Sequence, residues 1–169
     1  MAAREAEVIT SASDPEIVLT RVFDAPRSMV WDAWTDPAQV VQWWGPRGFT
    51  VTTHEIDVRV GGTWRFIMHG PDGTDYPNDV RFTEVVPQER LVHQHGGHRP
   101  GGTEVSFEMI VTFEDEGDGT RVTLRQVHPS MEIRDRVIRE YGAVEGGKQH
   151  LQKLAEYLER VTADHGFHG

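Results

Sequence analysis

The chain has 169 residues, no cysteine and a formal net charge of −10 at pH 7. This length suits a single domain, and the lack of cysteine excludes disulfides, zinc–thiolate sites, iron–sulfur clusters and a cysteine nucleophile. The acidic charge argues against nucleic acid or an anionic membrane as the main partner, because both require a basic face.

The two ends of the chain are expected to lie outside the folded domain, which spans residues 16–162. Residues 1–15 contain no apolar stretch typical of a secretory signal and predict a flexible arm, and residues 163–169 predict a flexible tail. No segment approaches the ~20 consecutive apolar residues that a membrane span needs. We therefore expect a cytoplasmic protein with no membrane partner.

The first elements of the domain are a strand and two short helices. Ile17–Phe23 is rich in β-branched residues, which favour a strand. Pro26 suits the first position of a helix, where its missing N–H costs nothing. Asp36 can cap a second short helix that carries Trp43 and Trp44. Neighbouring helical residues point ~100° apart, so we expect one of these indoles in the core and the other at the rim.

A run of strands separated by turn residues follows. The predicted strands are Phe49–Val58, Thr63–His69, Tyr76–Val86, Arg90–His95, Glu104–Glu114 and Arg121–Val127. The connections between them are short, and parallel strands would need long crossovers. The pattern therefore predicts an antiparallel meander.

The last predicted element is one long helix, Met131–Val161. Its apolar residues recur at steps of three and four, except at Gly147, which has no side chain. Two adjacent glycines, Gly146 and Gly147, cost roughly 1 kcal/mol each within a helix relative to alanine. Two interpretations stay open: the helix kinks or breaks there, or the missing side chain leaves space for a ligand.

These elements predict an α+β fold. A curved antiparallel sheet of about seven strands wraps around the long C-terminal helix, with two short helices after the first strand. The terminal helix is assigned to the concave face of the sheet because no other element has enough apolar length to cover it.

This order of elements, with particular motifs, resembles the START-like superfamily (SRPBCC, helix-grip or Bet v-like). Within it the sequence is similar to the branch of homologues of the C-terminal domain of the heat shock protein 90 ATPase activator. The resemblance covers roughly residues 16–161. It rests on Phe23-Asp24-Ala25-Pro26, Val30-Trp31, Asp36-Pro37, Trp43-Trp44-Gly45-Pro46, Gly61-Gly62-Thr63-Trp64, Gly70-Pro71-Asp72-Gly73, Pro87-Gln88-Glu89-Arg90-Leu91 and the leucines Leu151, Leu154 and Leu158. It departs from the family where Gly146-Gly147 stands in place of the common Gly-Trp pair. It implies a cavity between sheet and helix that often holds an apolar or amphipathic small molecule.

Strand alternation and the resemblance together predict the cavity lining. The expected lining residues are Trp34, Trp44, Trp64, Phe66, Met68, Phe82, Met109, Val111, Leu124, Gln126, His128 and Gly147. Alternation also turns Glu84 inward, although a one-residue bulge would reverse that assignment. Buried polar groups need partners or water. Glu84, Gln126 and His128 therefore mark either a polar end of the cavity or strand ends that meet water.

No metal site or cofactor is predicted. His93 and His95 share one strand face, as metal ligands can, but no acidic residue stands at a fixed spacing from them. The leading functional hypothesis is non-catalytic binding of a small hydrophobic or aromatic molecule. The first alternative is an enzyme of the cyclase or hydrolase type that uses His128 with Glu84 or Gln126 as acid and base. The second is a chaperone-associated ATPase regulator, as the branch's name implies. A homodimer is compatible with all three.

Overall fold

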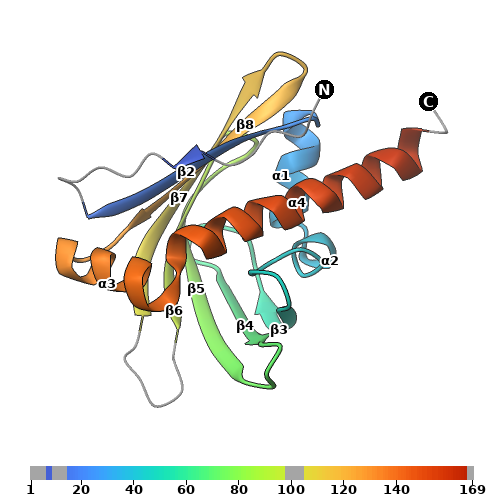
Figure 1. Ribbon diagram of the computed structural model, residues 1–169. Helices are drawn as coiled ribbons and strands as arrows, with labels where there is room; N and C mark the ends of the chain where they lie inside the picture. Colours follow the sequence, from blue (N-terminus) through green and yellow to red (C-terminus); the bar gives the residue numbers. More distant parts are fainter. Residues whose placement is uncertain (1–6, 9–14, 98–104, 167–169) are drawn as a thin grey trace.

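The computed structural model describes residues 7–8, 15–97 and 105–166, and its backbone is an open antiparallel sheet around a helix (Figure 1). The strands are β1 (Glu7–Val8), β2 (Glu16–Phe23), β3 (Thr50–Ile56), β4 (Thr63–His69), β5 (Asp75–Val86), β6 (Arg90–Gly97), β7 (Val105–Glu116) and β8 (Gly119–Val127). They form one eight-stranded sheet in the order β1-β2-β8-β7-β6-β5-β4-β3. The α+β class and the antiparallel meander are confirmed, with eight strands instead of about seven.

Two short helices follow β2, as expected, but the second ends before Trp43 and Trp44, which were predicted to lie on it. The two helices are α1 (Arg27–Thr35), which begins directly after Pro26, and α2 (Pro37–Val40). The carboxylate of Asp36 accepts a hydrogen bond from Ala38 N–H at 3.0 Å, which caps α2 in the predicted way. The α1 helix buries Val30, Trp31, Ala33 and Trp34 in the core.

The C-terminal helical region consists of two helices, α3 (Met131–Tyr141) and α4 (Ala143–Gly166). Figure 1 shows α4, in red, crossing the sheet, and it buries Leu151, Leu154 and Leu158 in the core shared with the strands and α1. Within the described part of the chain, no helix is both long enough and apolar enough to span a bilayer.

The helix break lies at Gly142, so the single helical segment predicted over Met131–Val161 is divided into two helices. Gly142 has φ +61°, in the left-handed region, and its N–H donates to the carbonyl oxygen of Val137. Such a residue ends a helix at little cost only when it is glycine. The helix α4 runs without interruption through Gly146 and Gly147, so the first of the two interpretations, a kink or break at these glycines, is wrong.

We expect Gly142→Ala to lower the free energy of unfolding by about 1 kcal/mol, because an alanine Cβ is strained in the left-handed region. No atom lies within 4 Å of the position a Cβ would take, so backbone strain alone carries the effect. Gly142→Asn, which tolerates this region better, should cost less. Urea unfolding of the two variants checks this ordering, and equal stability of Gly142→Ala and the parent chain contradicts it.

The predicted ends of the domain need two corrections. Glu7–Val8, assigned to the arm, pairs with Thr20 and Leu19 of β2 and forms the edge strand β1. The tail was expected from residue 163, but α4 continues to Gly166. Residues 1–6, 9–14 and 167–169, which complete the expected arm and tail, lie outside the described residues.

Candidate functional site

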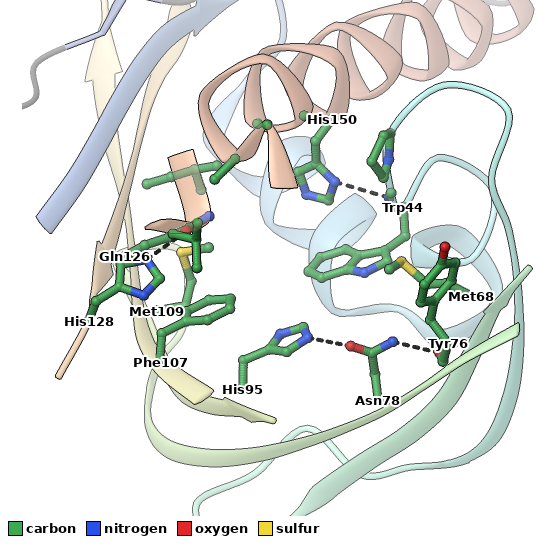
Figure 2. Close-up of a pocket in the computed structure, with 18 residues that line it drawn as sticks. Trp44, Met68, Tyr76, Asn78, His95, Phe107, Met109, Gln126, His128 and His150 are labelled. Carbon is green, nitrogen blue, oxygen red and sulfur yellow. Dashed lines mark hydrogen bonds between the residues drawn. The ribbon is translucent and has the colours of Figure 1, made fainter. Parts of the chain in front are cut away.

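A cavity of about 190 Å³ lies between α4 and the concave face of the sheet. Strands β4 to β8 supply one side of it, and α3, α4 and the segment after α2 supply the other (Figure 2). Most of its walls are apolar. Aromatic and thioether side chains come from Trp44, Met68, Tyr76, Phe107 and Met109. Its polar side chains are Asn78, His95, Gln126, His128 and His150.

Seven of the predicted lining residues do line the cavity: Trp44, Met68, Met109, Leu124, Gln126, His128 and Gly147. Alternation placed Met109 of β7, Leu124 and Gln126 of β8 and His128 directly after β8 on the concave face, because no bulge interrupts the pairing of the two strands. Of the two adjacent indoles, Trp44 faces the cavity. Trp43 lies in the core, where its Nε1 donates to the carbonyl oxygen of Ala33 at 3.0 Å.

Five predicted lining residues lie behind the wall instead: Trp34, Trp64, Phe66, Phe82 and Val111. They face inward, but other side chains cover them. Trp64 and Phe66 stack on each other with ring centroids 4.0 Å apart, and Trp44 packs against both. Trp34 lies edge-on to Trp43, with ring centroids 4.8 Å apart. Facing the concave side therefore places a residue in the core and does not by itself bring it to the cavity.

Glu84 lies outside the cavity, and the prediction that it faces inward is wrong. The register between β5 and β6 shifts between Phe82 and Glu84, so the alternation reverses at this point. Val85 packs against the core in its place. The Glu84 carboxylate pairs with Arg90 at 3.0 Å, and 45% of its side chain is exposed. Of the two pairs that the enzyme hypothesis offered, Glu84 with His128 is therefore not assembled, whereas Gln126 lies beside His128.

The missing side chain of Gly147 leaves no space for a ligand. A Cβ added at Gly147 would come within 2.3 Å of Cδ1 of Leu19, a fully buried residue of β2. The glycine thus allows β2 to approach α4 closely. Gly146 is the more open of the two, since its Cβ would meet only Pro46, at 3.8 Å.

His150 is a cavity residue that sequence reasoning missed. Its Nδ1 accepts a hydrogen bond from Gly45 N–H at 3.1 Å, and its ring centroid lies 4.5 Å from that of Trp44 (Figure 2). The ring centroid of the core residue Trp43 lies 4.9 Å away. Burial, with help from nearby Lys153 and His95, lowers the pKa of His150 to about 3. The neutral ring therefore carries its proton on Nε2. His150 stands three residues after Gly147 and four before Leu154. On a helix this spacing places all three on one face, which could have predicted that His150 faces the sheet.

His95 and Asn78 form a second ordered group in the cavity. His95 Nε2 lies 2.8 Å from Oδ1 of Asn78, whose Nδ2 donates to the carbonyl oxygen of Tyr76 at 2.8 Å. The His95 ring also stacks on Phe107, with centroids 4.9 Å apart and planes 9° apart. His93, its neighbour on the same face, is only 2% exposed and does not line the cavity. The described residues contain no group of three or more metal-ligating side chains that could hold an ion.

His128 and Gln126 meet at the other end of the cavity. The Nε2 atom of His128 lies 3.3 Å from Oε1 of Gln126, and the His128 residue is 3% exposed. Burial and the positive charge of Arg134 lower the pKa of His128. Among the described residues, none offers a hydrogen-bond partner to its buried Nδ1. This end of the cavity is thus made polar by the amide of Gln126 and the imidazole of His128.

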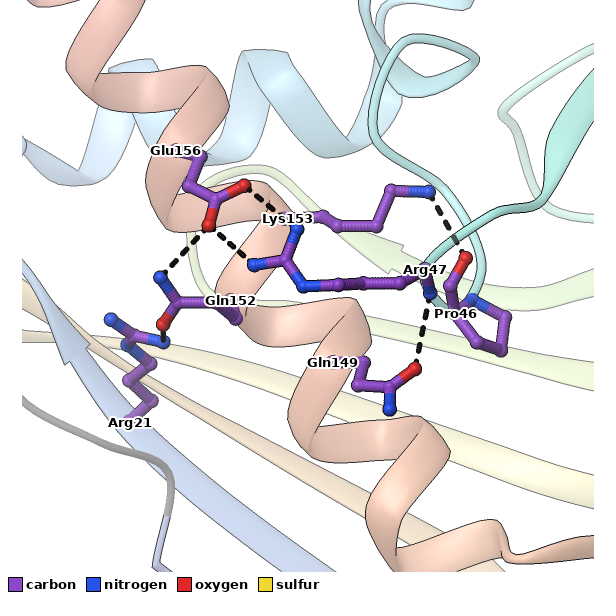
Figure 3. Close-up of polar contacts among 7 residues, drawn as sticks. All are labelled: Arg21, Pro46, Arg47, Gln149, Gln152, Lys153 and Glu156. Atoms are coloured by element: carbon purple, nitrogen blue, oxygen red, sulfur yellow. Dashed lines mark hydrogen bonds and ion pairs between the residues drawn. The ribbon is translucent and has the colours of Figure 1, made fainter.

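Polar contacts from α4 hold the wall segment 44–49 in place (Figure 3). Nζ of Lys153 donates to the carbonyl oxygens of Trp44, Pro46 and Phe49 at 3.2, 3.3 and 3.4 Å. Arg47 N–H donates to Oε1 of Gln149, and its guanidinium pairs with Glu156. This wall therefore belongs to the same rigid unit as α4.

The chain was compared with known families and structures. The family described as activator of Hsp90 ATPase homolog 1-like protein matches residues 24–159. A crystal structure of a Mycobacterium smegmatis protein is 26% identical, with a TM-score of 0.82, and the alignment covers 92% of this chain and 98% of that one. A solution structure of an Arthrobacter aurescens protein is 26% identical, with a TM-score of 0.83 and 91% coverage of both chains.

A third structure, of a Chromobacterium violaceum protein, is 26% identical, with a TM-score of 0.73 and coverage of 84% of this chain and 95% of that one. No curated protein sequence matches the chain. The fold and the family resemblance predicted from the sequence are confirmed.

Proposed function

The chain belongs to the family of activator of Hsp90 ATPase homolog 1-like proteins, and from this premise we propose that it binds a small, largely apolar aromatic molecule in the cavity under α4. The observation that carries the proposal is the cavity of about 190 Å³, walled by Trp44, Phe107, Met68 and Met109. Protein interiors are close-packed and contain few voids larger than a water molecule. An apolar cavity of about 150 Å³ is enough to hold benzene. The volume therefore suits a molecule of one or two rings.

Methionine methyl groups provide a direct test of this proposal. Met68 and Met109 line the cavity, whereas Met29 and Met131 do not. We expect a two-ring aromatic such as benzofuran to shift the NMR signals of the Met68 and Met109 methyls saturably, because aromatic rings perturb nearby methyl shifts. The signals of Met29 and Met131 should stay in place. Uniform or absent shifts at all four would exclude this cavity as the binding site.

A blocking variant and a matched control sharpen the test. Gly146→Leu adds a side chain to a residue that lines the cavity, where a Cβ has room. Glu145→Leu adds the same side chain one position earlier, at an exposed site of α4. We expect the Gly146 variant to lose benzofuran binding and the Glu145 variant to keep it. Thermal unfolding of both establishes that each is folded.

The description of the family supports a second candidate function, stimulation of an Hsp90 ATPase. The experiment is an ATPase assay of the cognate Hsp90 with and without this chain. A rise in turnover that survives in Gly146→Leu assigns the effect to a surface of the domain and separates it from the cavity. Unchanged turnover at saturating chain concentration dismisses the candidate and leaves the ligand-binding proposal standing.

A further inference from the structure

His150 presents a hydrogen-bond donor to the cavity. Its Nδ1 accepts a hydrogen bond from Gly45 N–H, so the proton of the neutral ring is on Nε2, on the other side of the ring. Burial, together with Lys153 and His95, lowers the pKa of His150 to about 3, so the ring is neutral near pH 7. Within the described part of the chain, no group accepts a hydrogen bond from Nε2. The fold therefore holds an N–H group that needs an acceptor.

This donor is open to the cavity. The inaccessible side-chain atoms that lack a partner include Nδ1 of His93 and of His128, but not Nε2 of His150. As a residue, His150 is half-buried, and it lines the cavity. In Figure 2 its ring extends from α4 toward the sheet, into the space between Trp44 and Phe107. Nε2 is therefore within reach of a ligand held in the cavity.

Aromatic rings fix the direction of this N–H. The indoles of Trp34, Trp43 and Trp44 surround His150, with ring centroids 5.8, 4.9 and 4.5 Å from that of the imidazole. With the hydrogen bond from Gly45, these contacts leave the imidazole little freedom to turn. A group that is already ordered loses little entropy on binding. The donor is therefore preorganised for an acceptor at one place.

The charges of the cavity decide which kind of acceptor fits. None of the described residues that line it is Asp, Glu, Lys or Arg. A carboxylate could accept from Nε2 of His150, but burying an ionised ligand group without an opposite charge is expensive. The ammonium group of Lys153 donates instead to three backbone carbonyl oxygens of the wall segment 44–49. A neutral acceptor, such as a carbonyl oxygen or a pyridine-type nitrogen, carries no such cost.

We propose that the cavity selects an uncharged aromatic molecule whose carbonyl oxygen or ring nitrogen accepts a hydrogen bond from Nε2 of His150, the residue that determines this specificity. The inference rests on the proposed ligand-binding function and adds to it the polar group that the ligand carries. A ligand that fills the cavity displaces the water that would otherwise accept from Nε2. A buried donor left without an acceptor is costly, so a pure hydrocarbon loses affinity here.

Quinoline and naphthalene test the inference, because they have nearly the same shape and only quinoline has a ring nitrogen. Water solvates the two probes differently, so the quantity to compare is the ratio of their affinities in the parent chain and in a variant without the donor. We expect the affinity ratio, quinoline over naphthalene, to fall about tenfold in His150→Asn. This variant keeps an acceptor for Gly45 N–H but has no donor at the place of Nε2. Titrations followed at the Met68 and Met109 methyls give the affinities.

A second variant and a control assign the preference to one atom. The amide of His150→Gln can donate at the place of Nε2, so this variant should keep part of the parent ratio although it loses the contact with Gly45. Glu145→Leu, at an exposed site of α4, should keep the full ratio. In NMR spectra of the parent chain, the proton on Nε2 should move further downfield with quinoline than with naphthalene. Thermal unfolding establishes that each variant is folded.

The outcomes separate this inference from the proposed function. An affinity ratio that is the same in His150→Asn and in the parent chain overturns the inference and leaves ligand binding intact. A ratio that falls as far in His150→Gln as in His150→Asn assigns the effect to the contact with Gly45, and also overturns it. If quinoline and naphthalene both leave the Met68 and Met109 methyls unshifted, the inference and the proposed function fail together.

Discussion

Replacing Gly147 with alanine is expected to lower the free energy of unfolding by about 1–2 kcal/mol, although alanine is the better helix former. A Cβ at this position would come within 2.3 Å of Leu19 Cδ1, and Leu19 is a core side chain with 1% exposure. Overpacking a filled core costs about 1–3 kcal/mol, which exceeds the helix gain of roughly 1 kcal/mol.

The neighbouring glycine should show the opposite sign. A Cβ at Gly146 would meet only Pro46, at an ordinary contact distance of 3.8 Å. Gly146→Ala therefore keeps the helix gain and should raise the free energy of unfolding by about 0.5–1 kcal/mol. Urea unfolding at fixed pH measures both variants. Because the two positions are adjacent on one helix, helix propensity is the same for both and the difference reports packing against β2.

A double-mutant cycle identifies the contact. Leu19→Val removes the atom that a Cβ at residue 147 would meet. We expect the double variant Leu19→Val, Gly147→Ala to be more stable than the sum of the two single effects implies, by about 1 kcal/mol. Strict additivity would show that Leu19 is not what excludes a side chain at position 147.

Acid is expected to destabilise the fold well above the pH at which most carboxylates titrate. Burial, together with His95 in both cases and with Lys153 in the case of His150, lowers the pKa of His93 and of His150 to about 3. An unfolded histidine has a pKa of about 6.5. Between these values the unfolded chain binds more protons than the folded one. The stability that each neutral ring contributes is therefore complete above pH 6.5 and is lost as the pH falls toward 3.

Each histidine contributes a slope of up to about 1.4 kcal/mol per pH unit in this window, so the two together give up to about 2.8 kcal/mol per pH unit. Urea unfolding between pH 6.5 and 5 measures the slope before carboxylate protonation adds to it. His150→Asn, whose Oδ1 can still accept from Gly45 N–H, should remove about half of the slope. His54→Asn replaces an exposed histidine and serves as the control. A free energy of unfolding that does not change between pH 6.5 and 5 would contradict the lowered pKa values of these two histidines.

Most of the fold could be predicted because the patterns that determine it are local. Strand alternation and turn residues predicted every strand from β2 to β8, with β4 at its observed bounds. The cap at Asp36 follows from the chemistry of its own side chain and the N–H groups two residues on. The helix break at Gly142 was missed because the apolar stripe continues on both sides of it.

The cavity was only partly predictable, because its lining depends on how distant elements pack. Alternation brought Met109, Leu124, Gln126 and His128 to the concave face. It could not show the register shift between β5 and β6 that turns Glu84 to Arg90. Nor could it show that Trp44 covers Trp64 and Phe66 and so separates them from the cavity.

The sequence by itself therefore determined the class of fold, the order of its elements and the face of each strand wherever pairing is regular, since these depend on residues a few positions apart. Only the tertiary structure showed that Gly147 allows β2 to approach α4, and that His150 and His128 line the same cavity. The physical reason is distance along the chain. Leu19 lies against Gly147, and Gly45 donates a hydrogen bond to His150, although each pair is more than a hundred residues apart in the sequence. Contacts between such distant residues leave no pattern in the neighbouring sequence that could predict them.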